Sequence, residues 1–301
     1  MTDVVGIARR RLGLSAFNPW RGLSGQDTLT KIAIIAITVL MLVYILLPVF
    51  WMVKSSFQSA LDIRANPPIW FPTSLNLEAY EDVDLVIPVW QYLYNSVYVS
   101  LIATVFATAI ATAAAYVLAR FRFPYATLIL TLILVTQLIP PITRVFPIYT
   151  FIQNLGLLNT YTGIIIAYIG FSLPFAVLLL RGYFEASSPP ELEEAAMVDG
   201  CTYFSAFWRI ILPVSLPGIA AVAVFTFLNA WNDFLWASIL LNQGDMKTIQ
   251  VGIGDFASEG GGVQYVNLFM AACVLATIPA LIMFLFVQRW LVGGLTAGSV
   301  K

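Results

Sequence analysis

Polar side chains interrupt an apolar stretch late in the chain, in the segment FTFLNAWNDFLW. Five of its residues follow the spacing 0, +4, +7, +8 and +11, which places them on one face of a continuous helix. They are Phe225, Asn229, Asn232, Asp233 and Trp236. Carboxamides and a carboxylate can hydrogen-bond hydroxyl groups, and aromatic rings can cover the apolar faces of a sugar-like ring. The pattern therefore favours contact with a polyhydroxylated solute.

The same polar residues could instead hold helices together, because asparagine commonly bonds across neighbouring membrane helices. A carboxylate at the middle of a membrane helix costs about 2.5–3.5 kcal/mol on insertion scales, so by default it suggests a function. We favour the solute pathway and keep the helix-packing alternative open. Trp231 points the other way, towards lipid or a neighbouring helix. For Gln137, Tyr168 and Ser172, which are weaker pathway candidates, helix packing is the simpler explanation.

A second polar cluster, ELEEAAMVDG from Glu191 to Gly200, has the features of a short helix. The preceding Ser187-Ser188-Pro189-Pro190 is a helix-start signal, since serine can cap a helix and proline suits its first turn. The three acids Glu191, Glu193 and Glu194 then lie at the positive end of the helix dipole. Gly200 is a typical residue for ending the helix.

One face of this short helix is shallow and rich in alanine. Leu192, Ala195, Ala196 and Asp199 are spaced i, i+3, i+4 and i+7 and so share a face. Such a face suits docking in a groove of a partner protein. An ordinary helix lying at the membrane interface explains the same residues equally well. A second amphipathic stretch follows over Thr202–Ile211, before Pro213 and Pro217.

The composition places both clusters in a membrane protein. The 301 residues are 60% hydrophobic and 10% charged, with a mean hydropathy of +0.87. A soluble domain is about 45–50% apolar and about 25% charged. There is no histidine, and the two cysteines fit no zinc, haem or redox spacing, which counts against a metalloprotease or a histidine-based hydrolase. The net charge of −1 by itself says nothing about nucleic acid, and no nucleic-acid partner is expected.

Six apolar stretches are long enough to cross a bilayer, which needs about 20 residues each. The sequence therefore predicts an all-α integral membrane protein with six transmembrane helices. The predicted spans are Ile32–Val53, Ser96–Ala119, Leu128–Phe146, Thr162–Leu180, Ile219–Leu241 and Leu268–Val287. Pro140-Pro141 and Pro174 blur the ends of the third and fourth spans.

Lysine and arginine predict the orientation of these spans. With both termini in the cytoplasm, eleven basic residues lie inside and three (Lys54, Arg64 and Lys247) lie outside, while Arg144 lies near the outer end of the third span. The predicted organisation is a cytoplasmic tail 1–31, a first helix 32–53, an extracytoplasmic loop 54–94, a transmembrane core 95–287 with a cytoplasmic loop 181–218, and a cytoplasmic tail 288–301. Loop 54–94 is expected to be partly structured.

Several motifs give this chain a family resemblance. Glu194-Ala195-Ala196, then Gly200, Ile210 and Leu212-Pro213 follow the spacing of the cytoplasmic EAA signature of ABC importer permeases. The chain is also similar to the carbohydrate branch of that family, closest to the second, six-span permease subunit of maltose-type importers. This similarity is carried by NSVYVSLIATVF and AAYVLARFRFP within 95–124, FPTSLNLEAY at 71–80 and QRWLVGGLTAGSVK at 288–301.

The resemblance implies a type I ABC importer permease fold in a prokaryotic plasma (inner) membrane, with a definite set of partners. These are a homologous second permease, two ATPase subunits that bind ATP and Mg, and an extracytoplasmic substrate-binding protein. This chain itself carries no cofactor, no metal site and no catalytic residue, and it lacks a phosphate-binding loop of the form GxxxxGK[S/T].

Within the family, the acidic helix is a coupling helix that docks on the ATPase. The residues carried over for this contact are Glu194, Ala195, Ala196, Asp199 and Gly200, and Ile210, Leu212 and Pro213 set how the helix joins the fifth span. The expected cargo is a sugar, a di- or oligosaccharide. A polyol or a glycerol phosphate remains an alternative.

Two rival classes are less favoured. A multi-span membrane transferase needs several acids or a histidine at one membrane face, yet Asp233 is the one carboxylate inside a predicted span. An ion-coupled carrier needs no ATPase but usually needs more buried charge.

Overall fold

The computed structural model describes residues 28–71, 75–187, 190–260 and 265–297. Within these ranges the chain forms helices and loops and no strand, which confirms the predicted all-α class. Four helices are long and apolar enough to cross a membrane, or up to six elements if each of two bent helix pairs counts as one span. The chain divides into two compact units, Met1–Met52 and Val53–Lys301, which are described separately.

The first unit contains most of one helix, α2 (Thr28–Ser56), which continues into the second unit. Helix α2 includes the predicted first span Ile32–Val53. An 18-residue window within residues 30–56 has a mean hydropathy of 2.9, and Pro48 lies inside the helix. Of the predicted cytoplasmic tail 1–31, residues 1–27 lie outside the described residues.

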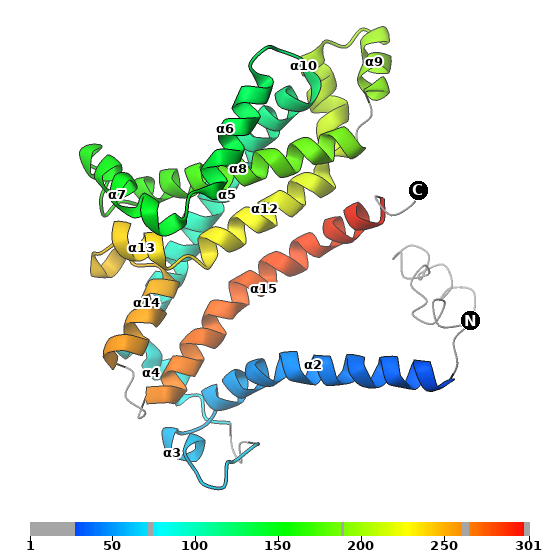
Figure 1. Cartoon of the computed structure of the whole chain (residues 1–301). Coiled ribbons are helices and arrows are strands. Elements are labelled where there is room, and N and C mark those ends of the chain that lie inside the picture. The colour runs from blue at the N-terminus through cyan, green and yellow to red at the C-terminus, as the bar shows by residue number, and fades with distance from the viewer. Residues whose placement is uncertain (1–27, 72–74, 188–189, 261–264, 298–301) are drawn as a thin grey trace. The chain divides into compact units, whose positions relative to one another are not determined.

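The second unit is built around four long helices: α5 (Val89–Arg120), α8 (Tyr161–Ser187), α12 (Leu216–Trp231) and α15 (Val266–Ala297). Helix α5 packs against α8 and α12, and α12 packs against α15 (Figure 1). A row of small buried residues on α5 permits close approach to its neighbours: Ser96, Ser100, Ala103, Ala107, Ala111 and Ala115. The start of α12 also approaches α8 closely. A Cβ added at Gly218 would lie 2.5 Å from the ring of Tyr183, so this contact needs the missing side chain of glycine.

The predicted third span, Leu128–Phe146, is wrong as a single helix. The region consists of α6 (Ala126–Leu138), η2 (Pro141–Arg144) and α7 (Val145–Asn154). The bend between α6 and the following pair is 103°. Proline disfavours a helical conformation in the residue before it, and Ile139 before Pro140 is extended (φ −77°, ψ 118°). The chain therefore turns sharply at Pro140.

The predicted fifth span, Ile219–Leu241, is also divided. Helix α12 ends at Trp231, and a new helix, α13 (Leu235–Leu240), begins after a short junction. At the other end of the chain, α15 extends the predicted sixth span as far as Ala297, so most of the predicted tail 288–301 continues that helix. Residues 298–301 lie outside the described residues.

The elements at the N-terminal end of α5 are short helices joined by loops. They are α3 (Ala60–Ile63), α4 (Glu78–Val86), η4 (Gly244–Met246), α14 (Ile249–Asp255) and η5 (Phe256–Gly260). The first two confirm that loop 54–94 is partly structured. Helix α4 buries Ala79 and Val83 and packs against α15.

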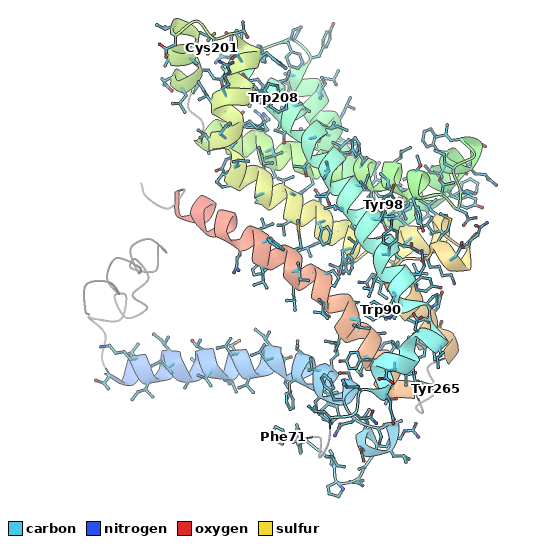
Figure 2. The ribbon with its side chains drawn as sticks, turned by 180° about the vertical axis from the view of Figure 1, so that it is seen from behind. Phe71, Trp90, Tyr98, Cys201, Trp208 and Tyr265 are labelled. Atoms are coloured by element: carbon cyan, nitrogen blue, oxygen red, sulfur yellow. The ribbon has the colours of Figure 1, made fainter. Side chains whose placement is uncertain are left out.

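At the opposite end of α5 lie the acidic helix and its continuation (Figure 1). These elements are α9 (Glu191–Val198), α10 (Tyr203–Ala206), the π-helical turn η3 (Phe207–Ile211) and α11 (Leu212–Val214). Figure 2 shows Cys201 and Trp208 at this end, whereas Trp90 and Tyr265 lie towards the other end of the same unit. Residues 203–214 meet α12 at an angle of 74°.

Candidate functional site

The acidic segment forms the predicted short helix, α9, and ends as predicted at Gly200. Gly200 has φ +86°, in the left-handed region. Its N–H bonds to the carbonyl of Met197 at 3.0 Å, and the N–H of Cys201 bonds to the carbonyl of Ala196 at 2.9 Å. This is the two-bond Schellman ending, in which glycine is preferred because it has no Cβ. Ser188 and Pro189 of the predicted start lie outside the described residues, and Pro190 occupies the N-cap position.

One face of α9 is buried inside the protein. Glu193 and Ala196, three residues apart, are each 3% exposed. Glu193 forms an ion pair with Arg120 at the end of α5, with 2.5 Å between Oε1 and Nε. The hydroxyl of Tyr116 donates to Oε2 of the same carboxylate at 3.1 Å. The acid in the middle of the cluster is therefore part of the internal structure.

The exposed face of α9 differs from the predicted one. Ala196 is turned inwards, while Glu194, Ala195, Asp199 and Gly200 are exposed. Val198, which the spacing argument left out, is 88% exposed. The faces differ because the buried carboxylate of Glu193 determines the rotation of the helix. No local sequence signal predicts this pairing, because Arg120 and Glu193 lie 73 positions apart and only the fold brings them together.

The remaining motif residues lie where the acidic segment joins the core. Ile210 belongs to η3 and packs against the buried cluster around Phe184 and Leu180. Leu212 and Pro213 form the next turn, α11, directly before the 74° bend into α12. Proline in the first turn of a helix lacks an N–H that would be unpaired there anyway.

The second candidate region is a cavity of about 200 Å³ beside the junction of α12 and α13. Its wall comes from three separate stretches of the chain: Pro141, Arg144, Tyr168, Phe171, Ser172, Asn229, Ala230, Asp233 and Trp236. The broken third span contributes the first two of these residues. Of the five residues predicted to share a helical face, Asn229, Asp233 and Trp236 border this cavity.

Asp233 is held in place by both side-chain and backbone donors. The hydroxyl of Tyr168 donates to its Oδ2 at 2.8 Å. The N–H groups of Trp236 and Ala237 donate to the same oxygen at 3.1 and 2.9 Å. An acidic side chain that accepts these bonds starts a helix. This is the physical reason why residues 219–241 form two helices and why the predicted common face does not extend across the junction.

The other two residues of the predicted face lie elsewhere. Asn232, at the end of α12, is exposed and does not border the cavity. Phe225 stacks on Phe175 of α8, with 4.0 Å between ring centroids. Asn229 borders the cavity but also bonds through Nδ2 to the carbonyl of Phe225 at 2.8 Å. Trp231 is 2% exposed and stacks with Phe227, so it faces neighbouring helices.

Two of the three weaker pathway candidates border this cavity. Tyr168 and Ser172 line it, although helix packing was the simpler expectation, whereas Gln137 is exposed and lies outside it. Arg144 also lines it, with its guanidinium 5.7 Å from the centroid of Phe171. Its Nε is buried and makes no hydrogen bond within the described residues. The sequence signal was that Arg144 is the one basic residue inside a predicted span.

Buried small residues, proline-broken helices and a polar cavity between them are features of a multi-span transport protein. Residues 107–296 match the family described as the binding-protein-dependent transport system inner membrane component. The chain belongs to this family of ABC transporter permeases. The family resemblance noted in the sequence is thereby confirmed, and the family is one of transport components, not of catalytic enzymes.

Characterised relatives are named as sugar permeases. The permease DasC of the diacetylchitobiose uptake system of Streptomyces coelicolor is 36% identical over 87% of this chain and 94% of its own length. The permease MalG of the trehalose/maltose system of Thermococcus litoralis is 32% identical over 92% and 99%. The permease SmoH of the sulfoquinovosyl glycerol system of Agrobacterium fabrum is 34% identical over 93% and 97%. These homologues indicate the permease subunit of a sugar ABC importer.

A solved structure has the same fold. One chain of a bacterial ABC transporter involved in the import of the acidic polysaccharide alginate superimposes with a TM-score of 0.77 and is 22% identical. The match covers 89% of this chain and 98% of that chain. A second structure, the alginate transporter in complex with an alginate pentasaccharide-bound periplasmic protein, has a TM-score of 0.65 at 17% identity. The chain therefore has the ABC importer permease fold.

Proposed function

We propose that this chain carries a di- or oligosaccharide across a prokaryotic plasma membrane, with energy from separate ATPase subunits that dock on α9. The chain works beside a homologous second permease and receives its cargo from an extracytoplasmic binding protein. ATP and Mg are bound by the ATPase subunits. Six spans and two cytoplasmic termini complete this arrangement, with α9 on the cytoplasmic side.

The observation that carries the proposal is the division of α9 into two faces. Its inner face is tied to the end of α5 through Glu193, and its outer face presents Glu194, Ala195, Val198 and Asp199 to the surroundings. A shallow face with one exposed valine and acidic flanks suits a groove lined by apolar and basic residues. Ala196 contributes by packing inwards, and the turn at Gly200 sets where the face ends.

The charges at the ends of the helices support this orientation. Arg120 ends α5, Arg181 lies in the last turns of α8, and Arg209 lies in η3 beside α9. Basic residues favour the cytoplasmic side of membrane helices. These charges support a cytoplasmic position for the end of the unit that carries α9.

The cavity beside Asp233 supports a sugar as cargo. It combines carboxylate and amide acceptors, an arginine donor and the rings of Phe171 and Trp236, whose centroids are 4.4 Å apart. Its volume of about 200 Å³ is below the roughly 300–1,000 Å³ of typical ligand pockets. We infer that this cavity holds one part of the solute and that the second permease supplies the rest of the site.

Cysteine cross-linking tests the ATPase contact. In a background with Cys201→Ser and Cys273→Ala, Ala195→Cys and Val198→Cys are expected to cross-link to a cysteine placed in the docking groove of the ATPase. Ala196→Cys is the matched control, because it is the same change on the adjacent, buried residue. Cross-linking at residue 196 as strong as at 195, or none at 195 and 198, contradicts docking through this face.

Reconstitution tests the cargo. The chain is purified with its partner subunits, placed in proteoliposomes with the binding protein, and assayed for ATP hydrolysis against di- and oligosaccharides, polyols and glycerol phosphate. Stimulation by one or more of the saccharides is expected. Stimulation by a polyol or glycerol phosphate alone would replace the proposed cargo.

A further inference from the structure

We propose that Arg120 and Glu193 are positioning residues whose buried ion pair makes α9 and α5 move as one body. This inference rests on the proposed function, because it concerns the helix on which the ATPase is proposed to act. It assigns a role to two residues outside the contact face and outside the solute cavity. A movement of α9 is then passed on to the far end of α5, because the ion pair, which we call the joint, keeps the two helices in a fixed relative orientation.

The joint is built from several partners. Arg120 and Glu193 have side-chain exposures of 8% and 4% and lie 2.5 Å apart. Nη2 of Arg120 also donates to the carbonyl of Phe184 in α8, at 3.4 Å. Tyr116, one turn back on α5, donates to the second carboxylate oxygen. Three elements, α5, α8 and α9, therefore meet at one guanidinium–carboxylate pair.

Helix α9 depends on this joint for its orientation. It contains eight residues, and isolated helices shorter than about 12–15 residues are only marginally stable in water. Apart from Glu193, the side chain buried on its inner face is the methyl group of Ala196. A methyl group cannot determine the rotation of a helix as a charged pair can, because it makes few directional contacts. The ion pair is therefore the main directional link between α9 and the long helices.

Helix α5 is suited to pass on a movement. Among the long helices described, α2, α8 and α15 contain Pro48, Pro174 and Pro279, whereas α5 has neither proline nor glycine in its 32 residues. At about 1.5 Å per residue it is about 48 Å long. Helix kinks occur chiefly at proline and glycine. A helix of this length exceeds the roughly 30 Å thickness of the hydrocarbon core of a bilayer.

The opposite end of α5 is tied to another segment in the same manner. Nδ2 of Asn95 donates to the carbonyls of Asp245 and Lys247, each at 2.9 Å. The hydroxyl of Ser96 accepts from the N–H of Ile249 at 2.7 Å. One helix thus holds α9 at one end and the residues between α13 and α14 at the other.

Distance measurements between spin labels test the joint directly. Labels are attached to cysteines at Trp90 and Leu192, which are 58% and 38% exposed and lie outside the proposed ATPase contact, in the cysteine-free background, and the whole complex is studied in nanodiscs. In the otherwise unchanged protein the distance distribution should be narrow and equal with and without ATP. With Glu193→Ala, the distribution should broaden roughly twofold because α9 opens locally from α5.

Glu191→Ala is the matched control, since Glu191 is an exposed acid in the same helix, and it should leave the width unchanged. If Glu193→Ala does not accumulate in membranes, Glu193→Gln, which keeps the shape but not the charge, is measured in the same way. An unchanged width in the Glu193 variant overturns the proposal. A shift of the distance on ATP binding in the unchanged protein overturns it as well.

A functional readout separates positioning from folding. In proteoliposomes, Glu193→Ala should lower the sugar transported per ATP hydrolysed by about fivefold or more, while ATP hydrolysis continues. Equal loss of both activities argues against a positioning role. A failure of the proposed function can be told apart from a failure of this inference. If residues 195 and 198 do not cross-link to the ATPase, the proposed ATPase contact is wrong, whereas the label distances within this chain are unaffected.

Discussion

Glu193 and Asp233 are two carboxylates in an apolar protein, and each accepts a hydrogen bond from a tyrosine hydroxyl. Their surroundings differ in every other respect. Glu193 is 3% exposed and paired with Arg120. Asp233 takes part in none of the ion pairs of the described residues, bonds to backbone N–H groups and borders a cavity. A sealed charge pair connects helices, whereas a carboxylate open to a cavity can also meet a solute.

Arg120 and Arg144 differ in the same way as the two carboxylates. Arg120 donates to a carboxylate and to a backbone carbonyl. Arg144 lies over the ring of Phe171, and its buried Nε makes no hydrogen bond within the described residues. A planar guanidinium with unused donors at a cavity wall can bind an oxygen of a sugar. We therefore expect variants of the Glu193 cluster to affect stability first, and variants of the cavity to affect uptake first.

The largest effect on stability is expected from Arg120→Met. It leaves the Glu193 carboxylate buried without its cation, which costs about 3–5 kcal/mol. The free energy of unfolding in mixed micelles measures this. Adding Glu193→Met should restore most of the loss, since an apolar pair of similar volume is often neutral. The control Arg122→Met, on an exposed side chain, should change stability by less than about 0.5 kcal/mol.

Asp233→Leu is expected to have the largest effect on uptake. It removes the cap of α13, which costs about 0.5–2 kcal/mol of stability. Hydrogen bonds to charged groups contribute about 1.5–3 kcal/mol, so uptake should fall about tenfold or more. Radiolabelled sugar uptake and co-purification with the second permease are compared. An equal loss of uptake and assembly would support the helix-packing alternative for this residue.

Tyr168→Phe separates the two roles of Asp233. It removes one hydrogen bond to the carboxylate and keeps the ring, so stability should fall by about 0.5–1.5 kcal/mol. The acceptor oxygen that is released remains in the cavity, so uptake should fall less than in Asp233→Leu. If Tyr168→Phe is as damaging to uptake as Asp233→Leu, the hydroxyl itself contacts the solute.

Arg144→Ala should raise the KM for uptake and have little effect on stability. The contact of a cation with an aromatic ring is worth about 0.5–1 kcal/mol at exposed sites and about 2 kcal/mol when desolvated, which limits the stability loss. Arg144→Lys keeps the charge but not the planar donors, so it should recover the KM only in part. A full recovery with lysine would show that charge alone is recognised.

The smallest effect is expected for Arg181→Ala, which breaks the exposed ion pair with Glu185. The two side chains are 33% and 44% exposed and lie one turn apart on α8. Exposed helix pairs of this kind contribute about 0.3–0.5 kcal/mol. The same unfolding measurement that detects Arg120→Met should barely detect this change. A loss comparable to that of Arg120→Met would remove the distinction between buried and exposed pairs.

Local rules predicted those features that depend on neighbours in the chain. The helical ending at Gly200 follows from a preference that acts within five residues, and the long apolar helices follow from composition. The break at Pro140 was only partly foreseen, because proline in a membrane helix ends it in some contexts and merely bends it in others, as at Pro174 in α8. The break at Asn232 was missed, because Asp233 can either continue a helix or accept from the backbone N–H groups that start a new one, and its neighbours in the sequence do not decide between the two.

Composition by itself determined that this chain is a helical membrane protein, because long apolar stretches can be read from residue types in order, and the resemblance of its motifs to those of ABC importer permeases indicated the family. Only the tertiary structure decided which carboxylate is sealed and which faces a cavity. Glu193 meets Arg120 across 73 positions of sequence, and Asp233 meets Tyr168 across 65. Such pairs depend on how whole helices pack, and helix packing is set by many contacts at once.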